Sequence, residues 1–168
     1  MPEPPRLTLP TRVWYLELDE LRPSAPGPGV RLEHAAVPFG PLNRLFYTEI
    51  GRDFHWVDRA GWPAERWQRW AEQIETWVAY ADGTPAGYAE VQPLADRADI
   101  AFFGLLVPFR GRGIGGALLT RAAQRALELS DRVTLNTCEL DGPHALRNYE
   151  ARGFRVVEER VEPRGRTG

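Results

Sequence analysis

A glycine-rich segment late in the chain has the residue types that grip a phosphate. Its sequence reads Arg110-Gly111-Arg112-Gly113-Ile114-Gly115-Gly116. Glycine lets the backbone approach a bulky anion closely and take left-handed conformations. An apolar run precedes the segment and an amphipathic run follows it, so we expect a strand-to-helix turn whose free N–H groups and helix dipole favour a phosphate. The two arginines would add charge-assisted contacts.

Two common nucleotide-binding patterns fit this segment poorly. The Walker pattern requires a lysine, and the sequence contains none. The spacing of Gly111, Gly113 and Gly116 fits the Gly-x-Gly-x-x-Gly pattern of dinucleotide-binding folds. However, the segment lies late in the chain and no repeated strand–helix–strand pattern precedes it. A nucleotide-binding protein that uses the same turn stays an alternative.

The elements that must position this turn follow from hydrophobic periodicity. Helical spacing predicts helices over 42–51, 63–74, 113–129 and 144–151, and strand patterns cover 12–18, 30–37, 76–81, 86–91, 99–107, 132–138 and 154–162. Asp82-Gly83 is a favoured hairpin turn. The nearly all-apolar run over 99–107 is typical of a central strand that is covered on both faces. The fold class is therefore α/β, with a mixed sheet and helices packed on its faces.

Two motifs in the second half of the chain resemble the hallmarks of a known superfamily. Arg110-x-x-Gly113-x-Gly115 resembles the Gln/Arg-x-x-Gly-x-Gly/Ala signature of the GCN5-related N-acetyltransferase (GNAT) superfamily. The segment from Ala145 to Phe154 resembles its second hallmark, Ala-x-x-x-Tyr-Glu-x-x-Gly-Phe. The resemblance is strong over 76–157. It implies one N-acetyltransferase domain over 1–168, with a mostly antiparallel sheet, helices on both faces and a splayed central strand.

The resemblance also implies where the donor, acetyl-CoA, would bind. Backbone groups at the splayed strand end would pair with the pantetheine arm, at Leu105, Leu106 and Val107. The pyrophosphate would lie on Arg110, Gly111, Arg112, Gly113, Ile114, Gly115 and Gly116. Many members carry an asparagine where this chain has Gly142, so a pantetheine contact is lost or passes to Asp141 or Asn136. Asn148, inside the second motif, is also assigned to the donor side.

Direct attack of an amine on a thioester needs an acid, a base and an oxyanion donor. Tyr149 matches the general acid of the superfamily, because a phenol is protonated at neutral pH and can donate to a thiolate; otherwise it only packs on the donor. Asp99 and Glu90 are the candidate bases, with a water chain or a purely solvated role as alternatives. The backbone N–H of Leu106 or Val107 is the expected oxyanion donor.

By the same resemblance, residues 39–70 form the acceptor side. This stretch is rich in aromatic residues, most of which we assign to the core, while Tyr47, His55 and Trp56 are expected to face the acceptor. The predicted reaction is transfer of an acetyl group to a primary amine of a small molecule or peptide. A non-catalytic module that binds or senses acyl-CoA on the same scaffold is the alternative.

Composition narrows the remaining classes of function. The net charge is −2 and no basic stripe occurs, which argues against a nucleic-acid partner. One cysteine, Cys138, and scattered histidines form no metal-ligand cluster, so no metal site is expected. Nothing resembles a signal peptide or a membrane span, and we expect a cytoplasmic protein. The proline-rich residues 1–10 are expected to be loose, and a homodimer is possible because superfamily members are often dimers.

Overall fold

A computed structural model describes residues 7–165 of the chain. In chain order, the strands and α-helices are β1 (Thr8–Leu18), β2 (Val30–His34), α1 (Gly40–Gly51), α2 (Ala64–Gln73), β3 (Glu75–Ala81), β4 (Thr84–Pro93), β5 (Ala98–Leu105), α3 (Ile114–Leu129), β6 (Val133–Cys138), α4 (Ala145–Ala151) and β7 (Phe154–Gly165). Short 3-10 turns cover Val107–Phe109 and Glu139–Asp141.

The strands form one seven-stranded sheet in the order β2-β3-β4-β5-β6-β1-β7. Every neighbouring pair is antiparallel except β5 and β6, which are parallel. These two strands pair only at Ala98–Val133 and Asp99–Thr134 and then separate. The mixed, mostly antiparallel sheet with a splayed central strand is therefore confirmed.

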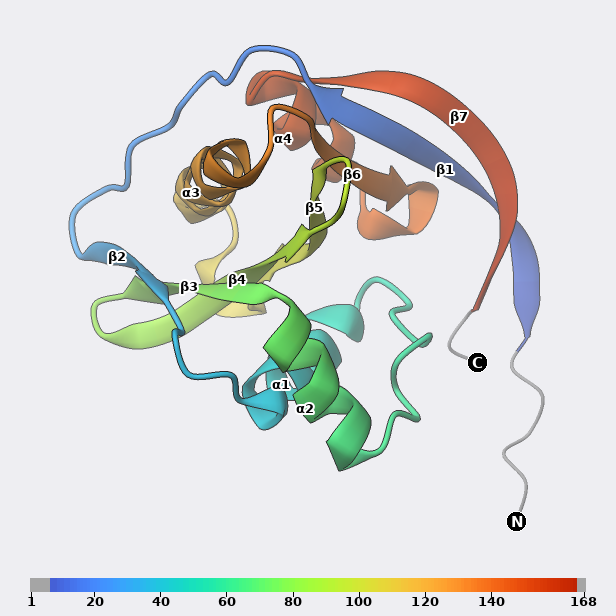
Figure 1. Ribbon diagram of the computed structural model, residues 1–168, viewed down its shortest axis with the longest axis horizontal. Coiled ribbons are helices and arrows are strands. Elements are labelled where there is room, and N and C mark those ends of the chain that lie inside the picture. Colours follow the sequence, from blue (N-terminus) through green and yellow to red (C-terminus); the bar gives the residue numbers. More distant parts are fainter. Residues whose placement is uncertain (1–6, 166–168) are drawn as a thin grey trace.

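Helices cover both faces of this sheet (Figure 1). On one face, α3 buries an apolar stripe of Leu118, Leu119, Ala122 and Ala126 in the larger core cluster, which Tyr149 of α4 also joins. On the other face, Phe46 and Ile50 of α1 pack with Val78 and Tyr88 in a smaller cluster. The gap between β5 and β6 thus lies between two packed layers.

Two turns take the backbone conformations that their residues predict. Asp82 and Gly83 have φ values of 49° and 84° between the paired residues Ala81 and Thr84, as a two-residue hairpin requires. Gly153 has φ 103° after α4, and a Cβ there would lie 1.8 Å from the carbonyl oxygen of Glu20. Only glycine fits that position, as the second sequence motif anticipates.

Several strand ends differ from the sequence-based expectation, and two of these differences have a physical explanation. Thr8 to Pro10, expected to be loose, form the start of β1 and pair with the end of β7. Proline is tolerated at Pro10 because β6 pairs with β1 only from Val13 onward, so one edge of this part of β1 has no strand partner. The second difference is at the end of β5, which we expected to reach Val107 but which ends at Leu105. Val107 and Pro108 begin a 3-10 turn instead, because proline has a fixed φ and no N–H to continue the hydrogen bonds of the sheet. Residues 1–6 of the expected loose segment lie outside the described residues.

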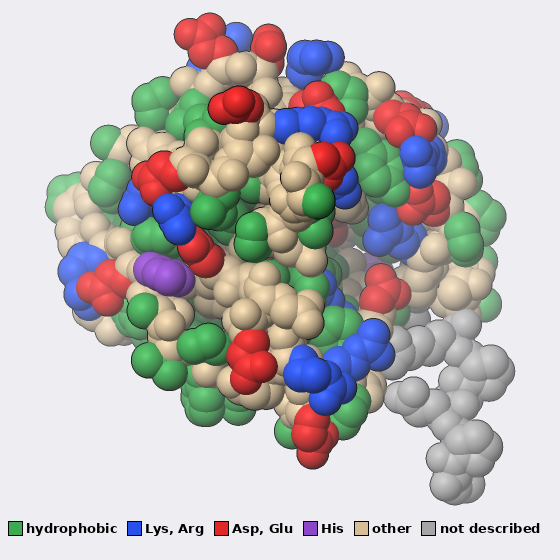
Figure 2. All heavy atoms as spheres, in the orientation of Figure 1, with side chains coloured by type: hydrophobic (Ala, Val, Ile, Leu, Met, Phe, Trp, Pro, Cys, Tyr) green, Lys and Arg blue, Asp and Glu red, His purple; other side chains and the backbone are tan. Residues whose placement is uncertain are grey.

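No helix within residues 7–165 has the length and apolar character required to span a membrane. Acidic and basic side chains are interspersed on the face of the molecule shown in Figure 2, without a patch of one sign.

Candidate active site

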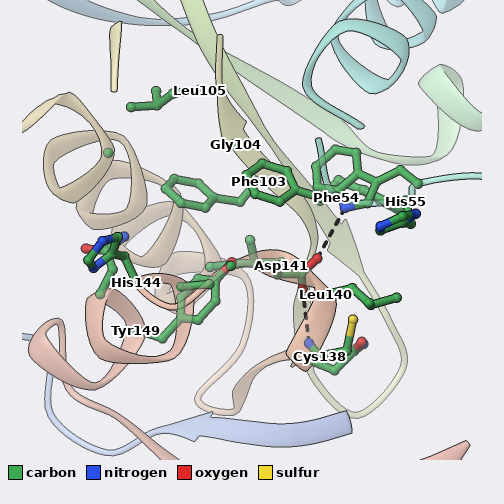
Figure 3. Close-up of a pocket in the computed structure, with 18 of the residues that line it drawn as sticks. Phe54, His55, Phe103, Gly104, Leu105, Cys138, Leu140, Asp141, His144 and Tyr149 are labelled. Atoms are coloured by element: carbon green, nitrogen blue, oxygen red, sulfur yellow. Dashed lines mark hydrogen bonds between the residues drawn. The ribbon is translucent and has the colours of Figure 1, made fainter. Parts of the chain in front are cut away.

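A cavity of about 600 Å³ opens where β5 and β6 separate. Its walls come from β5, the start of α3, the end of β6 with the turn that follows, α4, the α1–α2 loop and the end of β7. A volume of this size is typical of sites for small molecules and cofactors. Side chains from both halves of the chain therefore meet at one place (Figure 3).

The glycine-rich turn forms one end of the cavity. Gly111 and Gly113 have left-handed φ values of 72° and 78°, and a Cβ on either would meet no atom within 4 Å. Gly113 is the N-cap of α3, so the unpaired N–H groups of the first helical turn begin there. Gly115 and Gly116 also border the cavity. This open backbone surface at a helix N-terminus suits a phosphate.

Other residues of the same turn point elsewhere. Ile114 is buried in the core, so only its backbone is available to a ligand. Arg112 is not among the cavity-lining residues. Arg110 lines the cavity, but its Nε donates to the carbonyl oxygen of Leu105 at 3.0 Å and its Nη1 donates to Asp53 at 2.8 Å. The Arg110 side chain therefore links the end of β5 to the α1–α2 loop.

The strand end departs from the expected pattern of backbone contacts. Leu105 lines the cavity, whereas Leu106 and Val107 do not. The N–H of Leu106 donates to the carbonyl oxygen of Ala86 at 2.8 Å, so this N–H is committed to the sheet and is not available to an oxyanion. The segment of β5 that borders the cavity is Ile100 to Leu105, beyond the last pairing with β6.

Tyr149 borders the cavity from α4 and is 8% exposed. Its ring packs edge-on against Phe103 and Phe154, with centroid distances of 5.9 and 6.3 Å. Burial raises the pKa of the phenol well above its usual value, and the charge of Asp141 raises it further. The phenol is therefore protonated at neutral pH, as an acid must be.

Glu90 is fully buried on the α1–α2 side of the sheet and is not among the cavity-lining residues. Its carboxylate accepts hydrogen bonds from Asn43 Nδ2 at 3.0 Å and Trp70 Nε1 at 2.8 Å, and it pairs with Arg59 at 3.4 Å. Burial raises the pKa of Glu90, while Arg59 opposes that shift. The geometry makes Glu90 the centre of a buried polar network beneath the α1–α2 loop.

Asp99 lies at the last position where β5 pairs with β6, and it accepts a hydrogen bond from Thr134 Oγ1 at 2.6 Å. Burial raises the pKa of its carboxyl group, and the Thr134 hydrogen bond opposes that shift. Asp99 is adjacent to the cavity-lining residue Ile100 but is not itself among the lining residues.

Asp141 is a cavity-lining carboxylate that we expected only as a replacement pantetheine contact. Its Oδ2 accepts from Thr137 Oγ1 at 2.7 Å and from the Cys138 N–H at 3.0 Å, and its Oδ1 accepts from Trp56 Nε1 at 3.3 Å. The signal available in the sequence was its place beside Gly142, where the superfamily often has an asparagine. Asn136 and Asn148, the other polar residues assigned to the donor side, also line the cavity.

The three residues predicted for the acceptor side all border the cavity: Tyr47, His55 and Trp56. The Tyr47 hydroxyl accepts from the Arg59 N–H at 3.0 Å, which ties α1 to the loop that follows it. Trp56 packs edge-on against Phe102 at 5.0 Å. His55 has a positive φ of 57°, an uncommon conformation for a residue other than glycine.

Comparisons with known proteins agree with this architecture. The chain is 33% identical over 124 residues to a mycothiol acetyltransferase of Corynebacterium aurimucosum. This alignment covers 63% of this chain and 40% of that relative. It resembles in fold a GCN5-related N-acetyltransferase from Kribbella flavida, with a TM-score of 0.68 and 20% identity over 96% of this chain and 60% of the other. A second such structure, from Sphaerobacter thermophilus, has a TM-score of 0.66 and 23% identity over 96% of this chain and 54% of the other.

The chain thus spans less than two thirds of the length of these similar proteins. The sequence model of the acetyltransferase (GNAT) family matches residues 43–154, a range that includes the glycine-rich turn, Tyr149 and most of the cavity-lining residues. On this match, the chain belongs to the acetyltransferase (GNAT) family.

Proposed function

We propose that this protein transfers an acetyl group from acetyl-CoA to a primary amine of a small molecule or peptide. The observation that carries the proposal is one cavity that joins an open glycine backbone, a splayed strand and a protonated phenol. Membership of an acetyltransferase family supports the reaction class. The donor and the acceptor atom are our inference.

The shape of the cavity supports acetyl-CoA as the donor. Beyond Asp99, the backbone edge of β5 that faces β6 has no strand partner. An extended chain with amide groups, such as pantetheine, can pair with such an edge as another strand would. The pyrophosphate would then lie at Gly111 and Gly113, where the left-handed backbone leaves open space.

The reaction that these residues suit is direct attack of nitrogen on the thioester carbonyl carbon. A carbon–nitrogen bond forms, and the carbonyl electron pair moves to oxygen. When the carbon–sulfur bond breaks, the sulfur keeps the electron pair and takes the proton of Tyr149. The nitrogen must also lose a proton as it attacks.

The acceptor side combines aromatic and acidic groups. Phe54, His55 and Trp56 border the cavity from the α1–α2 loop, together with Asp58 from the same loop. Aromatic faces and carboxylates both attract a cationic amine. A primary amine is therefore the acceptor class that we propose.

The test is release of free thiol from acetyl-CoA across a panel of amines, with acetyl-CoA affinity measured separately by calorimetry. The panel contains a polyamine, an aromatic amine, an amino sugar and a peptide with a free N-terminus. We expect micromolar-to-millimolar binding of acetyl-CoA and turnover with at least one amine class. Failure to bind acetyl-CoA would refute the donor assignment.

The alternative, a non-catalytic acyl-CoA sensor, predicts a different result from the same experiment. A sensor binds acetyl-CoA but releases no thiol with any amine. Tyr149 at the cavity favours the enzyme, because a sensor has no need for a protonated phenol at that place.

A further inference from the structure

The carboxylates of the chain differ in their access to the cavity. Of the described acidic residues, only Asp58 and Asp141 are among those that line it, whereas Glu90 and Asp99 are not. Asp58 is exposed, and its Oδ1 would be 3.6 Å from a Cβ placed on Gly165. Asp141 lies deeper. In the view of Figure 3 it stands between Phe103 and Cys138, with Tyr149 on one side and His55 on the other.

The hydrogen bonds of Asp141 hold its carboxylate firmly and leave one position for a ligand. Two donors, Thr137 Oγ1 and the Cys138 N–H, bind Oδ2 at 2.7 and 3.0 Å. Oδ1 receives one longer bond, from Trp56 Nε1 at 3.3 Å. A carboxylate has about four lone-pair sites on its two oxygens. One site on Oδ1 therefore remains for a donor inside the cavity.

Asp141 also lies between the two halves of the site. Its negative charge helps to raise the pKa of Tyr149, the proposed acid, and the pKa of Cys138. Through Trp56 it contacts the α1–α2 loop, which forms the acceptor side. By contrast, the hydrogen bonds and the ion pair of Glu90 involve Asn43, Arg59 and Trp70, none of which is among the cavity-lining residues.

We propose that Asp141 is the catalytic carboxylate that receives the acceptor amine and takes its proton. This inference rests on the proposed acetyl transfer. The free position on Oδ1 accepts an N–H of the amine. As the carbon–nitrogen bond forms, the nitrogen becomes acidic and its proton passes to Asp141, which later releases it to solvent. The carbonyl electron pair moves to oxygen and returns when the carbon–sulfur bond breaks, and the sulfur takes the proton of Tyr149.

The products are then the acetamide and the free thiol. The cationic amine first releases one proton to solvent, and the nitrogen of the neutral primary amine then has two protons. One goes to Asp141 and the other stays on the amide. Tyr149 recovers its proton from solvent, which receives the proton of Asp141, so protons and electrons balance without a further reactant.

The experiment compares Asp141→Asn with Asp131→Asn and Asp99→Asn, using the amine of the panel that wild-type protein acetylates best. Each variant loses one carboxylate at constant size, and Asp131→Asn is the matched control, because Asp131 is exposed and is not among the cavity-lining residues. We expect Asp141→Asn to lower kcat by about 100-fold or more while acetyl-CoA affinity stays at the wild-type value. The two other variants should keep most of their turnover, and Asp141→Glu should recover part of it.

Four results would overturn the assignment, and a fifth concerns the function itself. Wild-type turnover in Asp141→Asn, or a large loss confined to Asp99→Asn, excludes Asp141 as the base. Weakened acetyl-CoA binding with unchanged kcat at saturation makes Asp141 a pantetheine contact instead. If Asp141→Asn fails to fold, Asp141→Glu decides, because turnover below detection in a folded variant that keeps the charge contradicts the proposal. If wild-type protein itself binds acetyl-CoA but acetylates no amine, the proposed function fails before Asp141 is tested.

Discussion

Tyr149 and Glu90 are both buried, yet only Tyr149 borders the cavity. Burial raises the pKa of both groups because water no longer stabilises their charged forms. For a phenol that acts as an acid, the raised pKa keeps the group in its active, protonated form. For a carboxylate that would act as a base, access to the substrate matters first, and Glu90 is enclosed by its own hydrogen-bond donors.

Tyr149→Phe tests the acid at the residue scale. The substitution removes one hydroxyl and keeps the ring contacts with Phe103 and Phe154, so acetyl-CoA affinity should stay close to that of wild type. Steady-state measurements at saturating acetyl-CoA should show a fall in kcat of about 100-fold or more. Unchanged turnover would remove the acid role.

The pH profile of wild-type kcat offers a second check on Tyr149. The acid form is the active one and persists below the pKa, so a raised pKa extends activity upward. We therefore expect no loss of kcat from this group below about pH 10, the ordinary value for a phenol. A loss of kcat centred near pH 8 in the wild-type protein, absent from the pH profile of Tyr149→Phe, would contradict this expectation.

The sequence located the site better than it described the side chains within it. Tyr149, the glycines of the turn, Tyr47, His55 and Trp56 all reach the cavity. Motif spacing determines where the backbone of a residue lies, because the element that carries it is periodic. It does not determine a rotamer, and for this reason the inward fold of Arg110 onto Leu105 and the free position on Asp141 were not predictable.

At the scale of elements, the α1–α2 loop is held to the sheet by arginines from two directions. Arg59, within the loop, pairs with buried Glu90 and lies 4.2 Å from the centroid of Phe102. Arg110 reaches the loop from the other side through Asp53. These anchors hold Tyr47, His55 and Trp56 at the cavity wall.

Arg59→Met should destabilise the fold in a pH-dependent way. The variant leaves Glu90 buried without its cation, which typically costs about 3–5 kcal/mol in the free energy of unfolding. Without Arg59 the pKa of Glu90 in the folded state rises further above its unfolded value of about 4.3. Glu90 then binds a proton more tightly in the folded state than in the unfolded state. The stability that this proton provides at low pH is lost as the pH rises through the pKa of Glu90 in the folded state.

Urea unfolding at pH 5.5 and pH 8 measures this effect, and the loss should be larger at pH 8. Arg52→Met is the control, because the ion pair of Arg52 with Glu49 is exposed and screened by solvent. An equal loss at both pH values would mean that Glu90 does not titrate and that lost packing explains the change.

Gly113→Val separates phosphate binding from backbone strain. Gly113 has φ 78° and open space beyond it, so valine strains the backbone by about 1–3 kcal/mol and fills the place that we assign to the pyrophosphate. Gly83→Val is the matched control, since Gly83 has φ 84°, equally open surroundings and no place in the cavity. Calorimetry should show loss of acetyl-CoA binding in the first variant only. Normal affinity in Gly113→Val would refute the phosphate cradle.

Hydrophobic periodicity was a reliable guide to which elements exist and less reliable for where they end. The amphipathic pattern before Leu129 and the Asp82-Gly83 pair are local signals, and both α3 and the hairpin appear where they were expected. The start of β1 depends on pairing with β7, more than a hundred residues away in sequence. A proline-rich segment gives no local sign of such a partner.

At the scale of the whole molecule, the cavity gathers residues from both layers and both halves of the chain. A donor bound there should therefore stabilise the entire fold. At 100 times its dissociation constant, acetyl-CoA adds about 2.7 kcal/mol to the free energy of unfolding, which corresponds to a rise in Tm of about 5–10 °C for a domain of this size.

Thermal unfolding with acetyl-CoA, ATP and NAD at matched concentrations checks this expectation. We expect a rise in Tm with acetyl-CoA and a smaller one or none with the others, which lack the pantetheine arm. Stabilisation by ATP or NAD but not by acetyl-CoA would instead support a nucleotide-binding protein and overturn the proposed donor.

The pairing of Thr8 with Gly165 has a practical consequence for every such measurement. Gly165 lines the cavity, and a Cβ there would lie 2.4 Å from Val57 of the α1–α2 loop. The three residues from Gly165 to Gly168 span at most about 11 Å and the seven from Thr8 to Met1 at most about 25 Å, so a tag joined at either end can reach the proposed acceptor side. Tags rich in histidine or lysine would present competing nucleophiles at high local concentration, so they should be cleaved before any acceptor is screened.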